Sequence, residues 1–160
     1  MEIERKFLVE RLPDDLGTHE SDRIEQGYIA ITEEGVEVRI RRYGDEAFLT
    51  IKSGGGEERL EEEIEIDDRR FQSLWPLTEG RRISKRRYRI PYERGALIEL
   101  DIYDGALQGL VIAEMEFDSL AAASAFAPPG WLGSEVTDEP GYKNKRLATD
   151  GLPQSFERAP

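Results

Sequence analysis

The chain opens with MEIERKFLV (residues 1–9), a stretch in which charged and apolar side chains alternate. Positions 2, 4 and 6 are charged, whereas positions 3, 7 and 9 are apolar. Successive side chains of a β-strand point to opposite faces, so a period of two predicts a strand with one charged and one apolar face. The question that decides the fold is which of these two faces lies inside.

The same alternation recurs along the chain and predicts further strands. Turn residues join several of them, as in Tyr43-Gly44-Asp45 and Glu93-Arg94-Gly95, and such short joins indicate antiparallel neighbours. The predicted strands are roughly Met1–Val9, Arg23–Ile31, Gly35–Tyr43, Ala47–Lys52, Glu57–Ile66, Arg82–Ile90, Ala96–Tyr103 and Leu110–Phe117.

Helical patterns are fewer and shorter. Asp67 and Ser119 are suitable N-caps for two of them, and prolines follow both. The predicted helices are Asp67–Trp75, Ser119–Phe126, a short helix near Tyr142–Thr149 and a single turn within Arg11–Gly17. We therefore predict an α+β, β-dominated fold that forms one domain over residues 1–160.

The composition argues against several kinds of site. The 160-residue chain has a formal net charge of -12, which makes it a poor general binder of nucleic acid. It has no cysteine and a single histidine, His19, which disfavours zinc sites and Ser/His triads. Any metal would be held by oxygen ligands, which suit magnesium, manganese or calcium. Because no membrane-length apolar run or signal peptide is visible, we expect a cytoplasmic protein without membrane contacts.

The charges segregate by strand. Acidic side chains dominate the first, fifth, seventh and eighth predicted strands, and basic ones dominate the third and sixth. A sheet with one solvated face remains an alternative, since antiparallel sheets often look like this. A solvated face usually mixes signs, however, and eight antiparallel strands can close with one face inward. We therefore predict a closed eight-stranded antiparallel β-barrel, in which the charged face lines a tunnel and a few flanking helices cover the apolar face.

A tunnel lined by charges is stable only if they pair or bind ions. One set offers oxygen ligands to a divalent cation, Mg²⁺ or Mn²⁺: Glu2, Glu4, Glu61, Glu63, Glu114 and Glu116. A second set offers partners to a polyphosphate: Lys6, Arg39, Arg41, Lys52, Lys85 and Arg87. Both sets together predict an anionic substrate held by basic walls, with metal ions between it and the acids.

The first motif, Glu2-Ile3-Glu4-Arg5-Lys6, resembles the ExExK motif of the CYTH superfamily, the triphosphate tunnel metalloenzymes. The resemblance continues in order along nearly the whole chain. The further matching segments are Gln26–Tyr28, Val38–Arg41, Leu49–Lys52, Glu61–Glu65, Ile83–Tyr88, Leu100–Tyr103, Ala113–Glu116, Trp131–Thr137 and Tyr142–Asn144.

The resemblance implies a tunnel that holds triphosphate by the basic set and metal by the acidic set. It leaves Asp101 at a polar tunnel position without an assigned role. It leaves two readings open for the segment Tyr142–Asn144, which either plugs one end of the tunnel or forms a surface helix. Four residues of suitable parity could also form ordinary salt bridges at the tunnel mouths: Arg59, Glu65, Arg89 and Glu99.

Members of this family hydrolyse inorganic, thiamine or RNA triphosphates or cyclise ATP, and short single-domain members are most often associated with inorganic triphosphate. The resemblance thus implies metal-dependent hydrolysis of triphosphate to diphosphate and phosphate. We expect a monomer or homodimer. Glu4, Glu116 and Lys85 are the candidate catalytic residues, with Lys85 as a candidate proton donor or acceptor. A class IV-type adenylate cyclase, another organic triphosphatase and a non-catalytic polyphosphate-binding module remain alternatives.

Overall fold

The computed structural model describes residues 3–54 and 60–156. Its main element is one eight-stranded sheet in the order β1-β8-β7-β6-β2-β3-β4-β5, with all pairs of neighbours antiparallel. The strands are β1 (Ile3–Leu8), β2 (Glu20–Ile31), β3 (Glu37–Tyr43), β4 (Glu46–Lys52), β5 (Glu61–Ile66), β6 (Arg82–Pro91), β7 (Leu97–Tyr103) and β8 (Val111–Phe117). Each strand expected from the alternation is present.

Three short α-helices flank the sheet: α1 (Asp68–Leu74), α2 (Leu120–Ala125) and α3 (Asn144–Asp150). The expected caps are confirmed, since the Asp67 side chain accepts a hydrogen bond from Arg70 N (2.8 Å) and the Ser119 side chain accepts one from Ala122 N (3.0 Å). The 3₁₀ turns are η1 (Leu16–Thr18), η2 (Trp75–Thr78), η3 (Glu93–Gly95), η4 (Gly105–Leu107) and η5 (Pro140–Tyr142). None of the described helices is long and apolar enough to cross a membrane.

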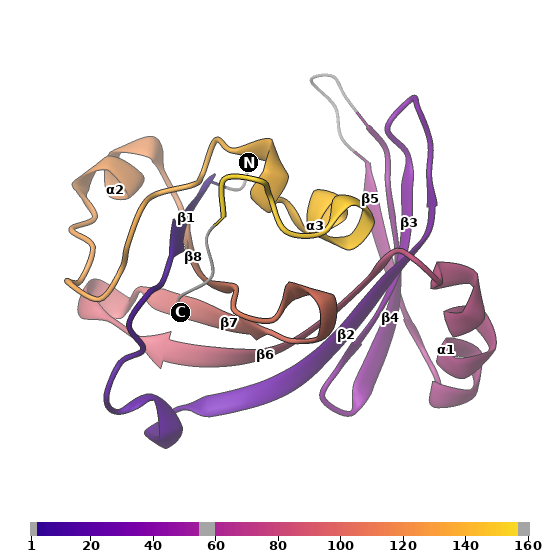
Figure 1. Cartoon of the computed structure of the whole chain (residues 1–160), viewed down its shortest axis with the longest axis horizontal. Coiled ribbons are helices and arrows are strands. Elements are labelled where there is room, and N and C mark those ends of the chain that lie inside the picture. The colour runs from indigo at the N-terminus through magenta and orange to yellow at the C-terminus, as the bar shows by residue number, and fades with distance from the viewer. Residues whose placement is uncertain (1–2, 55–59, 157–160) are drawn as a thin grey trace.

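The sheet curves into a cradle with two arms (Figure 1). β1 and β8 form one arm, β3, β4 and β5 form the other, and β7, β6 and β2 make the floor between them. Helix α1 lies outside the second arm and α2 lies beside the first, whereas α3 lies on the concave side. The β-dominated α+β prediction is confirmed.

The expected closure of the barrel is not confirmed. Within the described residues β1 pairs with β8 and β5 pairs with β4, but β1 and β5 do not pair with each other. A segment near the C-terminus occupies the free edge of β1 instead. Leu8 N donates to Ser134 O (2.9 Å), and Val136 N donates to Lys6 O (2.8 Å). Backbone groups that closure would require are therefore already hydrogen-bonded, and the sheet stays open.

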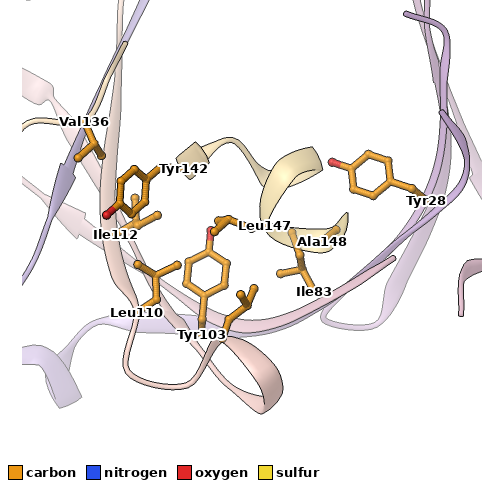
Figure 2. Close-up of a cluster of buried hydrophobic side chains, with 10 residues drawn as sticks. Tyr28, Ile83, Tyr103, Leu110, Ile112, Val136, Tyr142, Leu147 and Ala148 are labelled. Atoms are coloured by element: carbon orange, nitrogen blue, oxygen red, sulfur yellow. The ribbon is translucent and has the colours of Figure 1, made fainter. Parts of the chain in front are cut away.

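The C-terminal helix fills part of the concave side. Leu147 and Ala148 of α3 are buried in one hydrophobic cluster with Tyr28, Ile83 and Tyr103 from the sheet (Figure 2). Of the two readings left open by the sequence, the structure therefore supports a plug inside the cradle rather than a surface helix.

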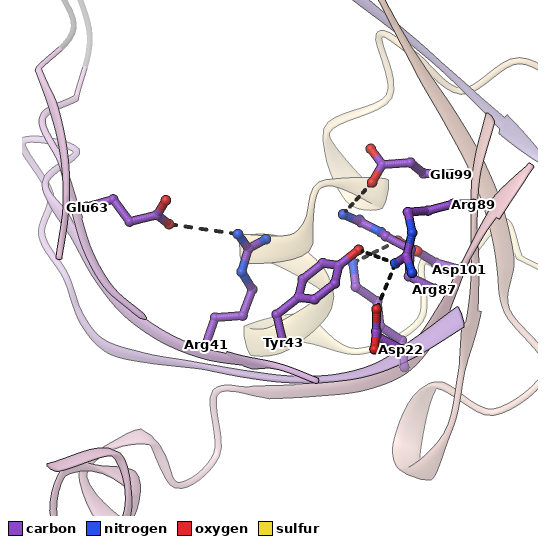
Figure 3. A network of polar contacts seen from close by, with 9 residues as sticks. Asp22, Arg41, Tyr43, Glu63, Arg87, Arg89, Glu99 and Asp101 are labelled. Carbon is purple, nitrogen blue, oxygen red and sulfur yellow. Dashed lines mark hydrogen bonds and ion pairs between the residues drawn. The ribbon is translucent and has the colours of Figure 1, made fainter. Parts of the chain in front are cut away.

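The outer face of the sheet is the apolar one. Phe71 of α1 packs with Ile40 and Ala47 outside the second arm, and a further apolar cluster lies around Leu100 and Met115 near the first. The charged faces of the strands are left to the concave side, as the side chains drawn in Figure 3 show. The assignment of faces made from the alternation is thus confirmed for these strands.

Candidate active site

The floor of the cradle carries a buried cluster of two cations and two carboxylates, contributed by β6 and β7. The Lys85 Nζ atom lies 2.8 Å from Asp101 Oδ2. Arg87 donates from Nε to Asp101 Oδ1 (2.8 Å) and from Nη2 to Asp101 Oδ2 (2.9 Å). A third nitrogen, Arg87 Nη1, lies 3.0 Å from Glu99 Oε2 (Figure 3). Lys85 is 1% exposed and Asp101 2%, so these charges meet away from bulk water.

The charge state of this cluster follows from its geometry. Burial alone would raise the pKa of Asp101, but the charge of Lys85 and the hydrogen bonds from Arg87 lower it to about 2. Burial lowers the pKa of Lys85 below its ordinary value, and attraction to Asp101 only partly offsets this. Asp101 is therefore ionised at neutral pH, and the ammonium group of Lys85 holds its proton less tightly than usual.

Across the cradle, β3 presents two arginines that each have one side-chain nitrogen without an acceptor. The buried Nε atoms of Arg39 and Arg41 have no hydrogen-bond partner. Arg41 Nη2 lies 3.8 Å from Glu63 Oε1 of β5, a loose contact (Figure 3). Burial, then the neighbouring charges of Arg39 and Arg87, lower the pKa of Arg41. Buried donors without acceptors are costly, so this arrangement favours an incoming anion.

Two further predicted residues of this arm are only loosely paired. Lys52 Nζ of β4 lies 3.8 Å from Glu61 Oε1 of β5, and both side chains are partly exposed. Glu63 also accepts a hydrogen bond from Thr50 Oγ1 (2.9 Å). Exposed pairs at such distances contribute little to stability, so these charges remain free to bind other ions.

The first arm carries the carboxylates of β1 and β8. Glu4 is the cross-strand partner of Glu116, and Lys6 is the partner of Glu114. A hydrogen bond with Glu114, then burial and the charge of Glu114, raise the pKa of Glu4 to about 7. Burial opposes ionisation of Glu114, but its hydrogen bond with Glu4 and the charge of Lys6 lower its pKa. The two carboxyl groups thus share one proton up to neutral pH.

The structure does not gather the predicted metal ligands into one cluster. Glu4, Glu114 and Glu116 lie on the first arm, whereas Glu61 and Glu63 lie on the second. Glu2 falls outside the described residues. Among the residues that are described, no group of three acidic or histidine side chains is placed to hold a metal ion. Carboxyl groups that share a proton still suit a hard cation, which would replace that proton.

The other predicted residues divide between the site and its margins. Lys6 is buried, and its Nζ donates to Tyr142 O of the C-terminal segment (3.3 Å). Arg89 Nη1 donates to Asp22 Oδ2 (2.8 Å) and to Tyr43 OH (3.0 Å), an ordinary salt bridge of the kind considered from the sequence. Arg59 lies outside the described residues.

Sequence reasoning missed two polar side chains of β2 that are buried beside the site. Gln26 Nε2 donates to Tyr28 OH (3.1 Å), and burial raises the pKa of Tyr28. A register shift follows Tyr28 in the pairing with β3, and Arg81 Nε donates to the Tyr28 carbonyl there (2.9 Å). Gln26 and Tyr28 have the parity of an inner face, which was the signal available in the sequence.

A separate groove of about 650 Å³ lies between β2 and α3. Its cations already have partners, since Arg81 donates to backbone carbonyls, Lys145 Nζ lies 3.1 Å from Glu37 Oε1 and Arg146 Nε lies 2.8 Å from Asp150 Oδ2. None of the predicted site residues lines it. The charged concave face is therefore the better candidate for the active site.

Known proteins resemble this chain over most of its length. An inorganic triphosphatase of Nitrosomonas europaea is 49% identical over 147 residues, which cover 92% of this chain and 96% of that protein. An inorganic triphosphatase of Acetivibrio thermocellus is 40% identical over 124 residues, or 76% of this chain and 77% of that protein. The crystal structure of an inorganic triphosphatase matches with a TM-score of 0.79 at 45% identity, covering 96% of this chain and 97% of the other.

The family assignment rests on the matched residues as well as on these relatives. The model of the CYTH domain matches residues 1–127, which contain all eight strands of the cradle and every side chain of the two predicted sets. The chain belongs to the CYTH domain family.

Proposed function

We propose that this protein hydrolyses inorganic triphosphate to diphosphate and phosphate in a metal-dependent reaction. The observation that carries the proposal is the pair of buried Arg39 and Arg41 Nε atoms without hydrogen-bond partners. Figure 3 shows that Arg41 faces Arg87 and Arg89 of β6 across the cradle. The relatives named inorganic triphosphatase, at 49% and 40% identity, support the same substrate. The cytoplasmic location and the monomeric or dimeric state expected from the sequence belong to this proposal too.

The substrate would be bound by cations from several strands. Arg39 and Arg41 offer donors that no protein group uses, and guanidinium groups bind phosphate oxygens bidentately. Lys52 is half-exposed beside them and can turn toward the same anion. A triphosphate is long enough to reach cations on separate strands, whereas a diphosphate would leave some of them without a partner. This is the physical basis for preferring the longer chain.

The carboxylates would hold the metal. Glu4, Glu114 and Glu116 lie on adjacent strands of one arm, and Glu2, Glu61 and Glu63 complete the proposed set. A bound Mg²⁺ or Mn²⁺ would neutralise phosphate charge and polarise water. At neutral pH the proton shared by Glu4 and Glu114 must leave before a cation takes its place.

Proton transfer falls to the side chains of the floor. Lys85 is a candidate because burial lowers the pKa of its ammonium group. Its Nζ lies 2.8 Å from Asp101 Oδ2 and 5.3 Å from the centroid of the Tyr103 ring, so its position is well defined. Phosphoryl transfer depends mainly on positioning and charge stabilisation, which this arrangement can supply.

A direct assay tests the proposal. The purified protein is incubated with triphosphate, diphosphate, ATP or thiamine triphosphate, each with Mg²⁺, Mn²⁺ or EDTA, and released phosphate and cyclic AMP are measured. We expect triphosphate to be hydrolysed fastest, and only with added metal. Faster hydrolysis of diphosphate, or cyclic AMP as the main product from ATP, would contradict it.

Paired variants locate the activity in the cradle. Arg41→Ala should reduce hydrolysis strongly, because it removes a phosphate partner. Arg70→Ala is a matched control, since Arg70 is exposed on α1 and pairs with Asp67, the N-cap of that helix. Equal activity of the two variants would remove the concave face from the proposal.

A further inference from the structure

Asp101 is the one member of the floor cluster to which sequence reasoning assigned no role. It lies on β7 opposite Arg87 of β6, and its inward side chain is almost completely buried. One carboxylate accepts three contacts: Oδ1 bonds Arg87 Nε, and Oδ2 bonds both Arg87 Nη2 and Lys85 Nζ, all within 2.9 Å. The relative position of Lys85 and Arg87 is therefore set through this single group.

A role in stability alone is a weak explanation for this arrangement. Burying a carboxylate between two cations carries a large desolvation penalty, and apolar residues in place of such a whole cluster often stabilise a protein as well or better. The neighbouring floor is apolar, since Ile83, Tyr103 and Leu107 pack together there. Apolar residues in place of Lys85, Arg87 and Asp101 together would thus have apolar neighbours.

A role in holding substrate is weaker still. A triphosphate is highly negative, and Asp101 places a permanent negative charge beside two of the cations that would attract it. Arg39 and Arg41, on the opposite side of the cradle, have no such carboxylate at their Nε atoms. Asp101 therefore weakens the attraction for substrate at the floor, so its contribution must lie in geometry.

Resting on the triphosphatase function proposed above, we propose that Asp101 is a positioning residue. It fixes the Lys85 ammonium and the Arg87 guanidinium in the orientation that the transferred phosphoryl group requires, and in doing so it lowers affinity for the unreacted substrate. Interactions that are aimed at the transition state raise kcat, whereas uniform attraction only lowers KM. Asp101 thus favours turnover over binding.

Two variants separate charge from geometry. Asp101→Asn keeps the size and removes the charge, so kcat should fall about 10- to 100-fold, as for other groups that orient reacting side chains. Its affinity for triphosphate in EDTA should stay the same or become tighter, because a repelling charge is gone. Asp101→Glu keeps the charge and moves it by one methylene, so kcat should fall with no gain in affinity.

Asp22→Asn is the matched control. Asp22 of β2 accepts from Arg89 Nη1 of β6 at 2.8 Å, and its carboxylate pairs with Arg89 rather than with Lys85 or Arg87. Although Asp22 stands opposite Arg87 in the sheet, its carboxylate holds Arg89, so kcat should stay within about twofold of the original protein. The measurements are steady-state kinetics on folded protein, calorimetric binding of triphosphate in EDTA, and melting temperature.

The outcomes discriminate between the roles. A fall in kcat with unchanged or tighter binding supports positioning. A lower melting temperature with kcat within twofold would reduce Asp101 to a structural pair, and weaker binding of triphosphate would make it part of substrate binding; both overturn the proposal. If Asp101→Asn does not fold, full kcat in Asp101→Glu overturns the proposal.

The failure of the proposed function can be told apart from the failure of this inference. If the original protein hydrolyses no triphosphate, the proposed function fails. Weaker triphosphate binding by Asp101→Asn would still overturn the inference about Asp101.

Discussion

Arg41 and Arg5 are both arginines, but they lie on opposite faces of the sheet. Arg41 points into the cradle with an unpaired Nε, whereas Arg5 donates outside it to Glu135 Oε1 (2.7 Å) and to Ala123 O (2.8 Å). The two residues therefore have different relations to a bound anion. Without ligand, truncation of Arg5 removes hydrogen bonds within the protein, whereas truncation of Arg41 removes only a loose contact with Glu63.

We predict that Arg41→Ala reduces the rise in melting temperature caused by triphosphate with calcium, used to limit turnover. A ligand at about 100 times its Kd adds roughly 2.7 kcal/mol to a protein it binds only when folded. Arg5→Ala should lower the starting melting temperature, because it removes outer contacts, but keep the rise. Thermal scans with and without ligand measure both. Identical rises in the two variants would refute the assignment of faces.

The raised pKa of Glu4 should make the stability of the protein depend on pH. Its pKa in the folded protein is raised to about 7 from 4.5, so the folded state binds the extra proton. The stability that this proton adds is fully present below about pH 4.5 and is lost as the pH rises through about 7. In EDTA, the original protein should therefore lose melting temperature relative to Glu4→Gln between pH 5 and pH 8. Parallel curves for the two proteins would show that the proton is not shared.

Strand β2 packs so closely against the η2 turn that only a glycine fits at the contact. A Cβ added to Gly27 would lie 2.5 Å from the Thr78 Cβ atom, and Thr78 is 0% exposed. Gly27→Ala should thus destabilise the protein by about 1–3 kcal/mol through overpacking. Gly17→Ala is the control, because nothing lies within 4 Å of its added Cβ. Denaturant unfolding measures both, and a neutral Gly27→Ala would mean that η2 moves away easily.

Alternation predicted the strands and their faces because it is a local property of the backbone. It could not predict closure, because the hydrogen bonds of Ser134 and Val136 to β1 come from an irregular segment without a periodic pattern. Parity likewise gives the face of each glutamate but not the arm on which it lies. Asp101 contacts both Lys85 and Arg87 because it lies opposite Arg87 in the sheet, and this register follows only from the pairing of the strands. These features of the site therefore became visible only in the structure.

The C-terminal helix α3 connects strands that are far apart in the sequence. Leu147 is 2% exposed and shares a cluster with residues of β2, β6, β7 and β8. We predict that Leu147→Ala costs about 2–5 kcal/mol and that the molecule still unfolds in one step. Leu120→Ala, at a 68% exposed site on α2, should change stability by less than about 0.5 kcal/mol. Denaturant titration compares them, and equal midpoints would show that the plug contributes little.

The open sheet also leaves β5 as an edge. Within the described residues no strand pairs with its outer side, and unpaired edges are templates for aggregation between molecules. The sequence of β5, EEEIEI, places four glutamates there, so two copies repel each other near neutral pH. As the pH falls toward the isoelectric point near 4.7, the net negative charge of the protein decreases and the repulsion between copies fades. The glutamates of β5 thus oppose edge-to-edge pairing of two molecules, and we expect acidic buffers to promote aggregation through this edge.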